Sequence, residues 1–175
     1  MLRRVSVVIV AVFIAVGAAA QDPACAAASE TKRSRMQANI WGVWKITELA
    51  SREPGAKWEV RTAPRLSQYI FTKQHYSYMY VPGADARTLF AGDPNTPTAA
   101  EKAEAYNSLV AATGTYTLSG RTLTLSAIVH KNPNEMVGKP LTYSVEFDGD
   151  TLLMVIVDPP FLPGREWRTV LTRVE

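Results

Sequence analysis

The feature that most constrains this chain is a series of short segments in which apolar and polar side chains alternate. Alternation with a period of two places the apolar side chains on one face of a β-strand. Segment 141–147 is typical, with its apolar residues at odd positions and Thr142, Ser144 and Glu146 between them. We expect strands at residues 40–49, 57–62, 67–72, 75–81, 114–129 (a hairpin), 141–147, 151–157 and 166–175.

The turns between these segments favour pairing between neighbours along the chain. Lys73-Gln74 has the length of a tight hairpin turn, the segment 114–129 turns at Ser119-Gly120, and Asp148-Gly149-Asp150 is a strong hairpin sequence. Eight or nine short antiparallel strands indicate a sandwich or an up-and-down barrel. We expect the barrel, because hairpins pair consecutive strands and because closure removes exposed sheet edges.

One short helix is expected in this all-β pattern. Thr98 and Glu101 have the spacing of a capping box, directly after Pro97. Apolar residues then recur at helical spacing, at Ala99, Ala103, Tyr106 and Val110. The helix is expected to end at Gly114 and to act as a cap or lid on the barrel.

Residues 1–20 have the pattern of a signal peptide. Arg3 and Arg4 precede an apolar run, and small residues stand before Gln21. The run is short for a membrane span. We expect export to the periplasm or the cell exterior, a linker over residues 21–38 and one barrel domain over residues 39–175. Membrane attachment through an uncleaved segment or a lipidated Cys25 is the lesser alternative.

Charge and cysteine content narrow the possible partners. Removing the two arginines of residues 1–20 lowers the formal net charge from +3 to +1, so no electrostatic footprint for nucleic acid is expected. Cys25 is the single cysteine and has no partner within the chain for a disulfide. Folding therefore depends on packing.

Gly42 and Trp44 begin the first expected strand in the sequence Gly42-Val43-Trp44. This tripeptide resembles the Gly-x-Trp signature of the lipocalin and calycin barrels. The resemblance implies that the tryptophan closes one end of the barrel, with an arginine of the last strand lying across it. Arg173 is the expected partner, and Arg168 is the alternative.

The second half of the chain resembles the lipocalin-like domain family of bacteria and fungi. The shared features are Gly-Thr-Tyr at 114–116, an Asn/Pro loop from 133 to Val-Gly at 137–138, and Gly-Asp-x-Leu at 149–152. The resemblance implies a calycin-type barrel over residues 40–175. Members often carry histidines where this chain has Leu125 and Ser126, and an arginine where it has Tyr143, so family chemistry at those positions is not expected here.

Patterns for catalysis or metal binding do not emerge. His75 and His130 lie far apart without metal-ligand spacing, and no nucleophile-elbow motif is present. We assign no catalytic residue, no metal and no cofactor. If alternation continues along 122–130, Val129 shares the inner face with Leu123 and Leu125, and His130 lies at the rim or outside.

The aromatic residues are the candidate ligand-binding residues. They fall on shared faces of neighbouring strands, and Tyr143 joins them from a later strand: Tyr69, Phe71, Tyr76, Tyr78, Tyr80 and Tyr143. One interpretation is a barrel wall that contacts an apolar or aromatic ligand. The other, which is more common, is cross-strand packing alone.

Three functions are compatible with these observations. The leading hypothesis is binding of a small hydrophobic molecule in the barrel, without catalysis. The second is an isomerase or cyclase that uses the same cavity on a polyketide- or terpenoid-like substrate. The third is a barrel filled by its own side chains that acts through its surface.

Overall fold

The structure is a computed structural model that describes residues 40–175 apart from 62, 65 and 84. The expected signal peptide, the linker and Cys25 lie outside these residues. The strands are β1 (Gly42–Arg52), β2 (Glu59–Arg61), β3 (Ser67–Phe71), β4 (His75–Tyr80), β5 (Val110–Ser119), β6 (Thr122–His130), β7 (Leu141–Asp148), β8 (Thr151–Val157) and β9 (Glu166–Arg173). The helices are α2 (Ala99–Asn107) and the 3₁₀ helix η1 (Pro133–Met136). Within the described part of the chain, no helix is long and apolar enough to cross a membrane.

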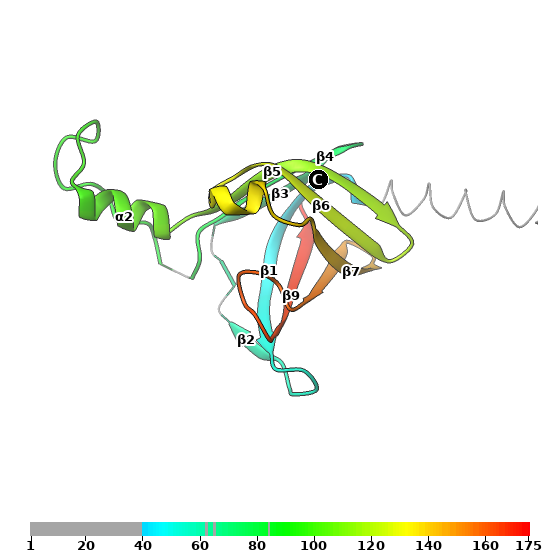
Figure 1. Cartoon of the computed structure of the whole chain (residues 1–175). Coiled ribbons are helices and arrows are strands. Elements are labelled where there is room, and N and C mark those ends of the chain that lie inside the picture. Colours follow the sequence, from blue (N-terminus) through cyan, green and yellow to red (C-terminus); the bar gives the residue numbers. More distant parts are fainter. Residues whose placement is uncertain (1–39, 62, 65, 84) are drawn as a thin grey trace, which may run out of the picture.

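The strands form one antiparallel sheet that closes into a barrel (Figure 1). Neighbours in sequence are neighbours in space from β3 to β9, and β1 pairs with both β3 and β9. Eight strands therefore make the barrel, and β2 is an extra strand on the edge of β1. The prediction of an up-and-down, lipocalin-like barrel with eight to nine strands is confirmed.

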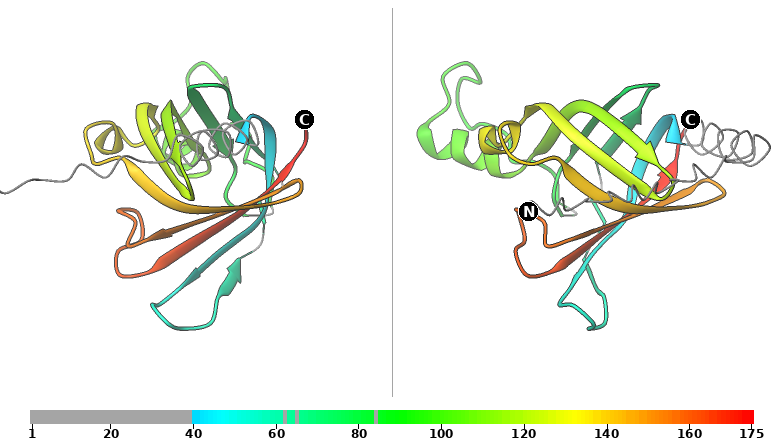
Figure 2. Two further views of the ribbon diagram at one scale, coloured as in Figure 1. Left: turned by 90° about the vertical axis from the view of Figure 1, so that its right-hand side faces the viewer. Right: turned by 45° about the vertical axis from the view of Figure 1, so that its right-hand side comes forward.

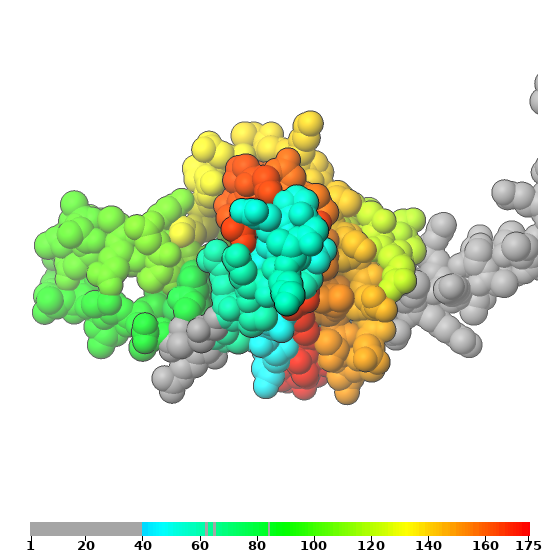
Figure 3. Space-filling model, turned by 90° about the horizontal axis from the view of Figure 1, so that it is seen from below, coloured from blue at the N-terminus to red at the C-terminus, as the bar shows by residue number. Residues whose placement is uncertain are grey.

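The seam between β1 and β9 closes the barrel. It runs from the pair Trp44–Arg173 to the pair Arg52–Glu166, with one register shift between Ile46 and Glu48. The other edge of β1 is shared, since its beginning pairs with β3 and its end pairs with β2. Figure 3 shows the hairpin of β2 beside the loop between β8 and β9, where Arg165 and Glu59 form an ion pair.

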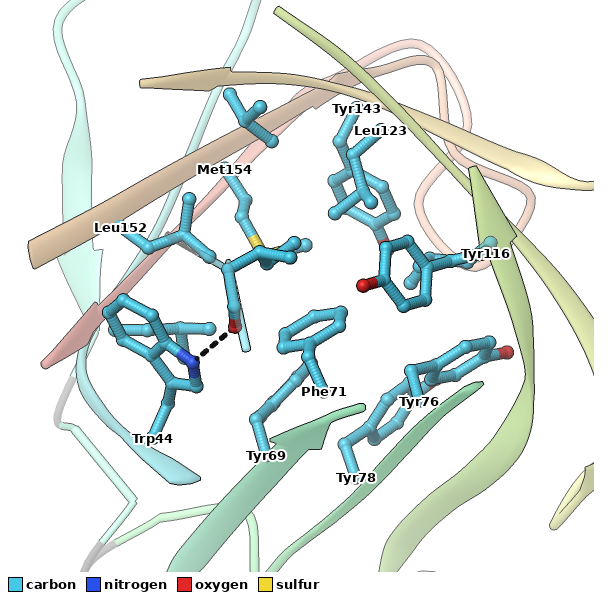
Figure 4. Close-up of a cluster of buried hydrophobic side chains, with 14 of the residues drawn as sticks. Trp44, Tyr69, Phe71, Tyr76, Tyr78, Tyr116, Leu123, Tyr143, Leu152 and Met154 are labelled. Carbon is cyan, nitrogen blue, oxygen red and sulfur yellow. Dashed lines mark hydrogen bonds between the residues drawn. The ribbon is translucent and has the colours of Figure 1, made fainter. Parts of the chain in front are cut away.

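One end of the barrel is filled by packed side chains. Trp44 is fully buried and donates its indole N–H to the carbonyl oxygen of Ile40 over 2.9 Å. Phe71 and Leu152 are buried beside it (Figure 4). The guanidinium of Arg173 lies 4.1 Å from the centre of the Trp44 ring. Of the two arginines considered as its partner, Arg173 takes this position, whereas Arg168 pairs with Glu48.

Position 42 requires glycine for two reasons, its backbone conformation and the lack of space for a side chain. Its φ of +131° is one that residues with a side chain rarely adopt. A Cβ there would lie 2.2 Å from the carbonyl oxygen of Glu175 and 2.7 Å from a nitrogen of Arg173. The Gly-x-Trp sequence thus lets the chain end and Arg173 approach the start of β1.

The helix differs from its expected form. The capping box of Thr98 and Glu101 is present, but the helix ends before Ser108, which is its C-cap. Val110 already pairs with Tyr80 of β4, so sheet pairing overrides the helical spacing seen in the sequence. No residue of α2 is buried, and Figures 1 and 2 show it extending away from the barrel rather than lying over it as a lid.

A β-bulge changes which residues of β6 face inward. Gly114 pairs with Ala127 and Thr113 pairs with Val129, which leaves Ile128 without an opposite residue. The expected inward position of Val129 is therefore wrong, since Val129 is 56% exposed. Gly114 does not end the helix; a Cβ on it would lie 2.0 Å from the carbonyl oxygen of Ser126. Its role is to let β5 approach β6 at the bulge.

Replacing Trp44 with alanine tests the closed end. Trp44→Ala should lower the free energy of unfolding by about 3–5 kcal/mol, because it empties a fully buried site. Trp58→Ala is the control; this half-buried ring contacts Arg52 and Arg168, and its loss should cost roughly 1 kcal/mol. Urea denaturation followed by circular dichroism measures both. Similar costs for the two variants would contradict the end-closing role of Trp44.

Candidate ligand-binding site

The other end of the barrel contains a cavity of about 450 Å³. It is lined by residues at the ends of β4 and β6 and at the starts of β5, β7 and β9, among them Tyr80, His130, Val110, Leu141 and Trp167. Trp44 lies at the start of β1 and pairs with the end of β9. Because adjacent strands are antiparallel, the cavity is at the opposite end from Trp44. The barrel is therefore packed at one end and hollow at the other.

Tyrosines form one wall of the cavity. Tyr69 and Tyr78 are directly opposite each other across β3 and β4, and their rings stack with centres 4.7 Å apart. Tyr76 and Tyr80 continue the row at 5.9 and 6.3 Å from Tyr78. The row faces inward, because Tyr69, Tyr76 and Tyr78 are buried whereas Met79 is 52% exposed.

The six aromatic candidates separate into three groups. The members that line the cavity are Tyr69, Tyr78, Tyr80 and Tyr143. Tyr76 lines a smaller cavity of about 190 Å³, to which Tyr78 also contributes. Phe71 lines neither; it is 2% exposed and packs edge-on against Tyr116 at the filled end.

Burial keeps the tyrosine hydroxyls protonated. It raises the pKa of Tyr76 and of Tyr80 to about 12. For Tyr69, Tyr78 and Tyr143, burial is again the main cause of a pKa well above the usual value, and repulsion from neighbouring tyrosines raises it further. The phenols are therefore neutral at physiological pH and can donate hydrogen bonds.

His130 lies at the mouth of the cavity. The bulge at Ile128 reverses the alternation of β6, so that His130 turns toward the interior and lines both cavities. Its Nε2 atom is 3.4 Å from the hydroxyl oxygen of Tyr78. The backbone N–H of Asn132 donates to its Nδ1 atom over 2.9 Å. The expected rim position is thus found, but the side chain is aimed inward.

The loop after β6 and the end of α2 complete the mouth. The ammonium of Lys131 lies 4.1 Å from the centre of the Tyr106 ring, and the Tyr106 hydroxyl donates to the Lys131 carbonyl oxygen. Partial burial lowers the pKa of Lys131. Glu135, on η1, lines the cavity as well. One positive and one negative side chain therefore stand at the entrance.

The smaller cavity lies where two barrel strands separate. β6 pairs with β7 only from Thr122 to Leu125, and the second half of β6 continues without β7 beside it. Ser126 and Ala127 line the space on one side, and Gly138 and Pro140 line it on the other. Because Tyr78, His130, Glu135 and Leu141 line both cavities, the two spaces are adjacent.

Several lining residues were not predicted from the sequence. Trp167, Thr169, Leu171 and Arg173 are each two residues apart along β9 and so share one face of the strand. The expected inward position of Arg173 was therefore a signal that Trp167 and Thr169 also face inward. Lys131, Asn132 and Glu135 lie in or beside a loop and follow no period. The inward direction of the His130 side chain was missed because the alternating pattern of the sequence does not reveal a bulge.

The two histidines lie at opposite ends of the barrel. His75 is exposed at the start of β4, whereas His130 ends β6. In residues 40–175, apart from 62, 65 and 84, no three His, Cys, Asp or Glu side chains are grouped to hold a metal ion. Glu146 is exposed on β7 and pairs with Arg121 at 2.7 Å, away from the cavity.

A closed up-and-down barrel of eight strands with a Gly-x-Trp end is a lipocalin-like fold. No family model matches the sequence, and no curated protein matches it. A comparison with solved structures finds a lipocalin-like protein from Bacteroides uniformis ATCC 8492 that is similar to this chain. The two share 15% sequence identity with a TM-score of 0.42, over 77% of this chain and 98% of the other.

The raised tyrosine pKa values predict weak resistance to alkali. Unfolded tyrosines ionise near pH 10, whereas Tyr76 and Tyr80 keep their protons to about pH 12 when folded. Above pH 10 the unfolded state thus binds fewer protons, and the free energy of unfolding should fall as the pH rises from about 10 to about 12. Phenolate absorbance should show most tyrosines ionising above pH 10 or together with unfolding. Ionisation of all of them near pH 10 in the folded protein would contradict their burial.

Proposed function

We propose that the protein binds a small, mainly apolar molecule in the hollow end of the barrel, without catalysis. The observation that carries the proposal is the cavity of about 450 Å³, whose lining includes five tyrosines. Cavities of roughly 300–1,000 Å³ with aromatic walls and few polar groups are typical of small-molecule sites. A barrel filled throughout by its own side chains would have no such space, so the surface-acting alternative is less well supported.

The wall of the cavity suits an apolar or aromatic molecule. Tyrosine rings offer large apolar faces, and ring stacking adds to the free energy of burial. Val110, Leu141 and Trp167 extend the apolar lining. Each phenol also carries a hydroxyl that can orient a polar atom of the ligand. The site thus combines apolar contact area with a few directional contacts.

The filled end supports binding at the hollow end. Trp44, Phe71 and Leu123 pack into one core with Tyr69 and Tyr78, so the tyrosine wall rests on buried side chains. A wall held in this way loses little conformational freedom when a ligand binds. We expect the cavity to be formed before the ligand enters. Export remains our proposal for the place of binding, on the pattern of residues 1–20.

An isomerase or cyclase is the second candidate. The observation that favours it is the presence of His130 and Glu135 among the ionisable side chains that line the cavity. Proton transfer requires such an acid or base within reach of the substrate. The Nδ1 lone pair of His130 is engaged by the Asn132 N–H, so Glu135 is the better base. Turnover that is lost in Glu135→Gln while ligand binding persists would favour the enzyme over the carrier.

Filling the cavity tests the binding proposal. Leu141→Trp places a larger side chain in the cavity and should weaken binding of an apolar fluorescent probe at least tenfold, because the ligand and the indole compete for one volume. Thr142→Trp is the matched control; it adds the same ring to the exposed, outer face of the same strand and should leave affinity unchanged. Fluorescence titration gives the dissociation constants, and circular dichroism verifies folding.

Two results would overturn the proposal. One is wild-type protein, freed of co-purified lipid, that binds no apolar probe. The other is equal probe affinity for Leu141→Trp and Thr142→Trp, which would locate binding outside the barrel. Native mass spectrometry of protein purified from its own host complements both measurements, since a retained ligand adds a defined mass.

A further inference from the structure

Three hydroxyls of the tyrosine wall have no hydrogen-bond partner among the described residues. Tyr69 and Tyr143 are each 7% exposed and line the cavity. Within the described part of the chain, no hydrogen bond is made by either hydroxyl, nor by that of Tyr80, which lines the same cavity. None of these hydroxyl oxygens is among the fully buried unpaired atoms, so each is accessible from the cavity and can pair with a molecule there. Hydroxyls left open toward a cavity therefore point to a partner that enters it.

Two more hydroxyls of the cavity, those of Tyr78 and Thr169, accept a hydrogen bond from a neighbouring side chain and keep their own hydrogen to donate. The Asn132 N–H contact of 2.9 Å is shorter than the 3.2 Å contact to the Asn132 carbonyl oxygen, and a backbone N–H can only donate. Nδ1 is therefore the acceptor, which leaves the ring hydrogen on Nε2, 3.4 Å from the Tyr78 oxygen. Tyr78 then accepts from His130 and keeps its own O–H for another partner. Thr169 likewise accepts from the Trp167 indole over 3.0 Å, and its own hydrogen is free to donate.

The cavity therefore presents hydrogen-bond donors from more than one wall. Tyr69, Tyr78 and Tyr80 stand on β3 and β4, whereas Tyr143 and Thr169 stand on β7 and β9. The rings of Tyr69 and Tyr78 stack on each other with an inclination of 20°, and Tyr80 lies at the end of the row, where a flat molecule in the cavity can stack on it. The charges at the mouth, Lys131 and Glu135, are opposite and give no net charge to pair with an ionised ligand.

Building on the proposed binding function, we infer that the ligand is a flat, neutral, aromatic carbonyl compound of the quinone or aryl-ketone class. Its ring system stacks against the Tyr80 end of the tyrosine row, and its carbonyl oxygens accept hydrogen bonds from the phenols that line the cavity. A hydrocarbon of the same shape fills the space but leaves the hydroxyls unpaired. The site thus selects for oxygen acceptors, not for apolar surface alone.

A matched pair of probes tests this inference. Anthraquinone and anthracene share one three-ring frame and differ in the carbonyl oxygens. In competition with the apolar fluorescent probe, anthraquinone should bind wild-type protein at least about tenfold more tightly, as expected for two or more added hydrogen bonds. Replacing Tyr69→Phe and Tyr143→Phe together removes only two oxygen atoms. This double variant should lose most of that preference by weaker anthraquinone binding, with anthracene binding unchanged.

Tyr116→Phe is the control for loss of a phenol oxygen. The Tyr116 hydroxyl donates to the Thr72 carbonyl oxygen over 2.7 Å and does not line the cavity, so the variant should keep the wild-type preference. Equal affinity of wild-type protein for the two probes would overturn the inference and leave the binding function in place. A preference that persists in the double variant would also overturn it. If neither probe binds, the binding function itself is wrong, and the inference falls with it.

Discussion

The pairing of β1 with β9 is the interaction on which the rest of this structure depends. It joins the first strand of the barrel to the last, and closure gives every strand one inner and one outer face. Trp44 and Arg173 form the first pair of this seam. Burial of Trp44 is worth about 3–5 kcal/mol and a cation–π contact about 0.5–2 kcal/mol. The buried indole therefore stabilises the closed end, and Arg173 mainly holds the chain end against it.

The same alternation of side chains produces two different barrel ends. At the end near Trp44, the inward residues pack against one another, as Phe71 and Tyr116 do edge-to-face at 5.4 Å. At the other end, β6 separates from β7 after Leu125, and the inward residues no longer meet across the interior. A cavity forms where the wall widens. The hollow end is thus a consequence of strand pairing, not of smaller side chains alone.

The sequence predicted the strands, their order and the closed barrel, because each depends on local alternation and on short hairpin turns. It did not predict the end of α2, since pairing of Val110 with Tyr80 is a long-range contact that outweighs helical spacing. Nor did it predict that His130 faces inward, because one unpaired residue at Ile128 reverses the alternation without changing the composition. Alternation also could not tell which face of Tyr76–Tyr80 is inside; closure of the sheet decides that.

In the closed barrel, the aromatic row can serve both cross-strand packing and ligand contact. Ring stacking between Tyr69 and Tyr78 explains why the tyrosines stabilise the barrel, yet phenylalanine would stack equally well there without presenting a hydroxyl to the cavity. Phe71 shows that the same strand uses phenylalanine where the interior is filled. Tyrosine occurs instead where the row borders the cavity. The rings therefore serve the fold, and the hydroxyls of Tyr69, Tyr80 and Tyr143 remain open to a molecule with matching acceptors in the space beside them.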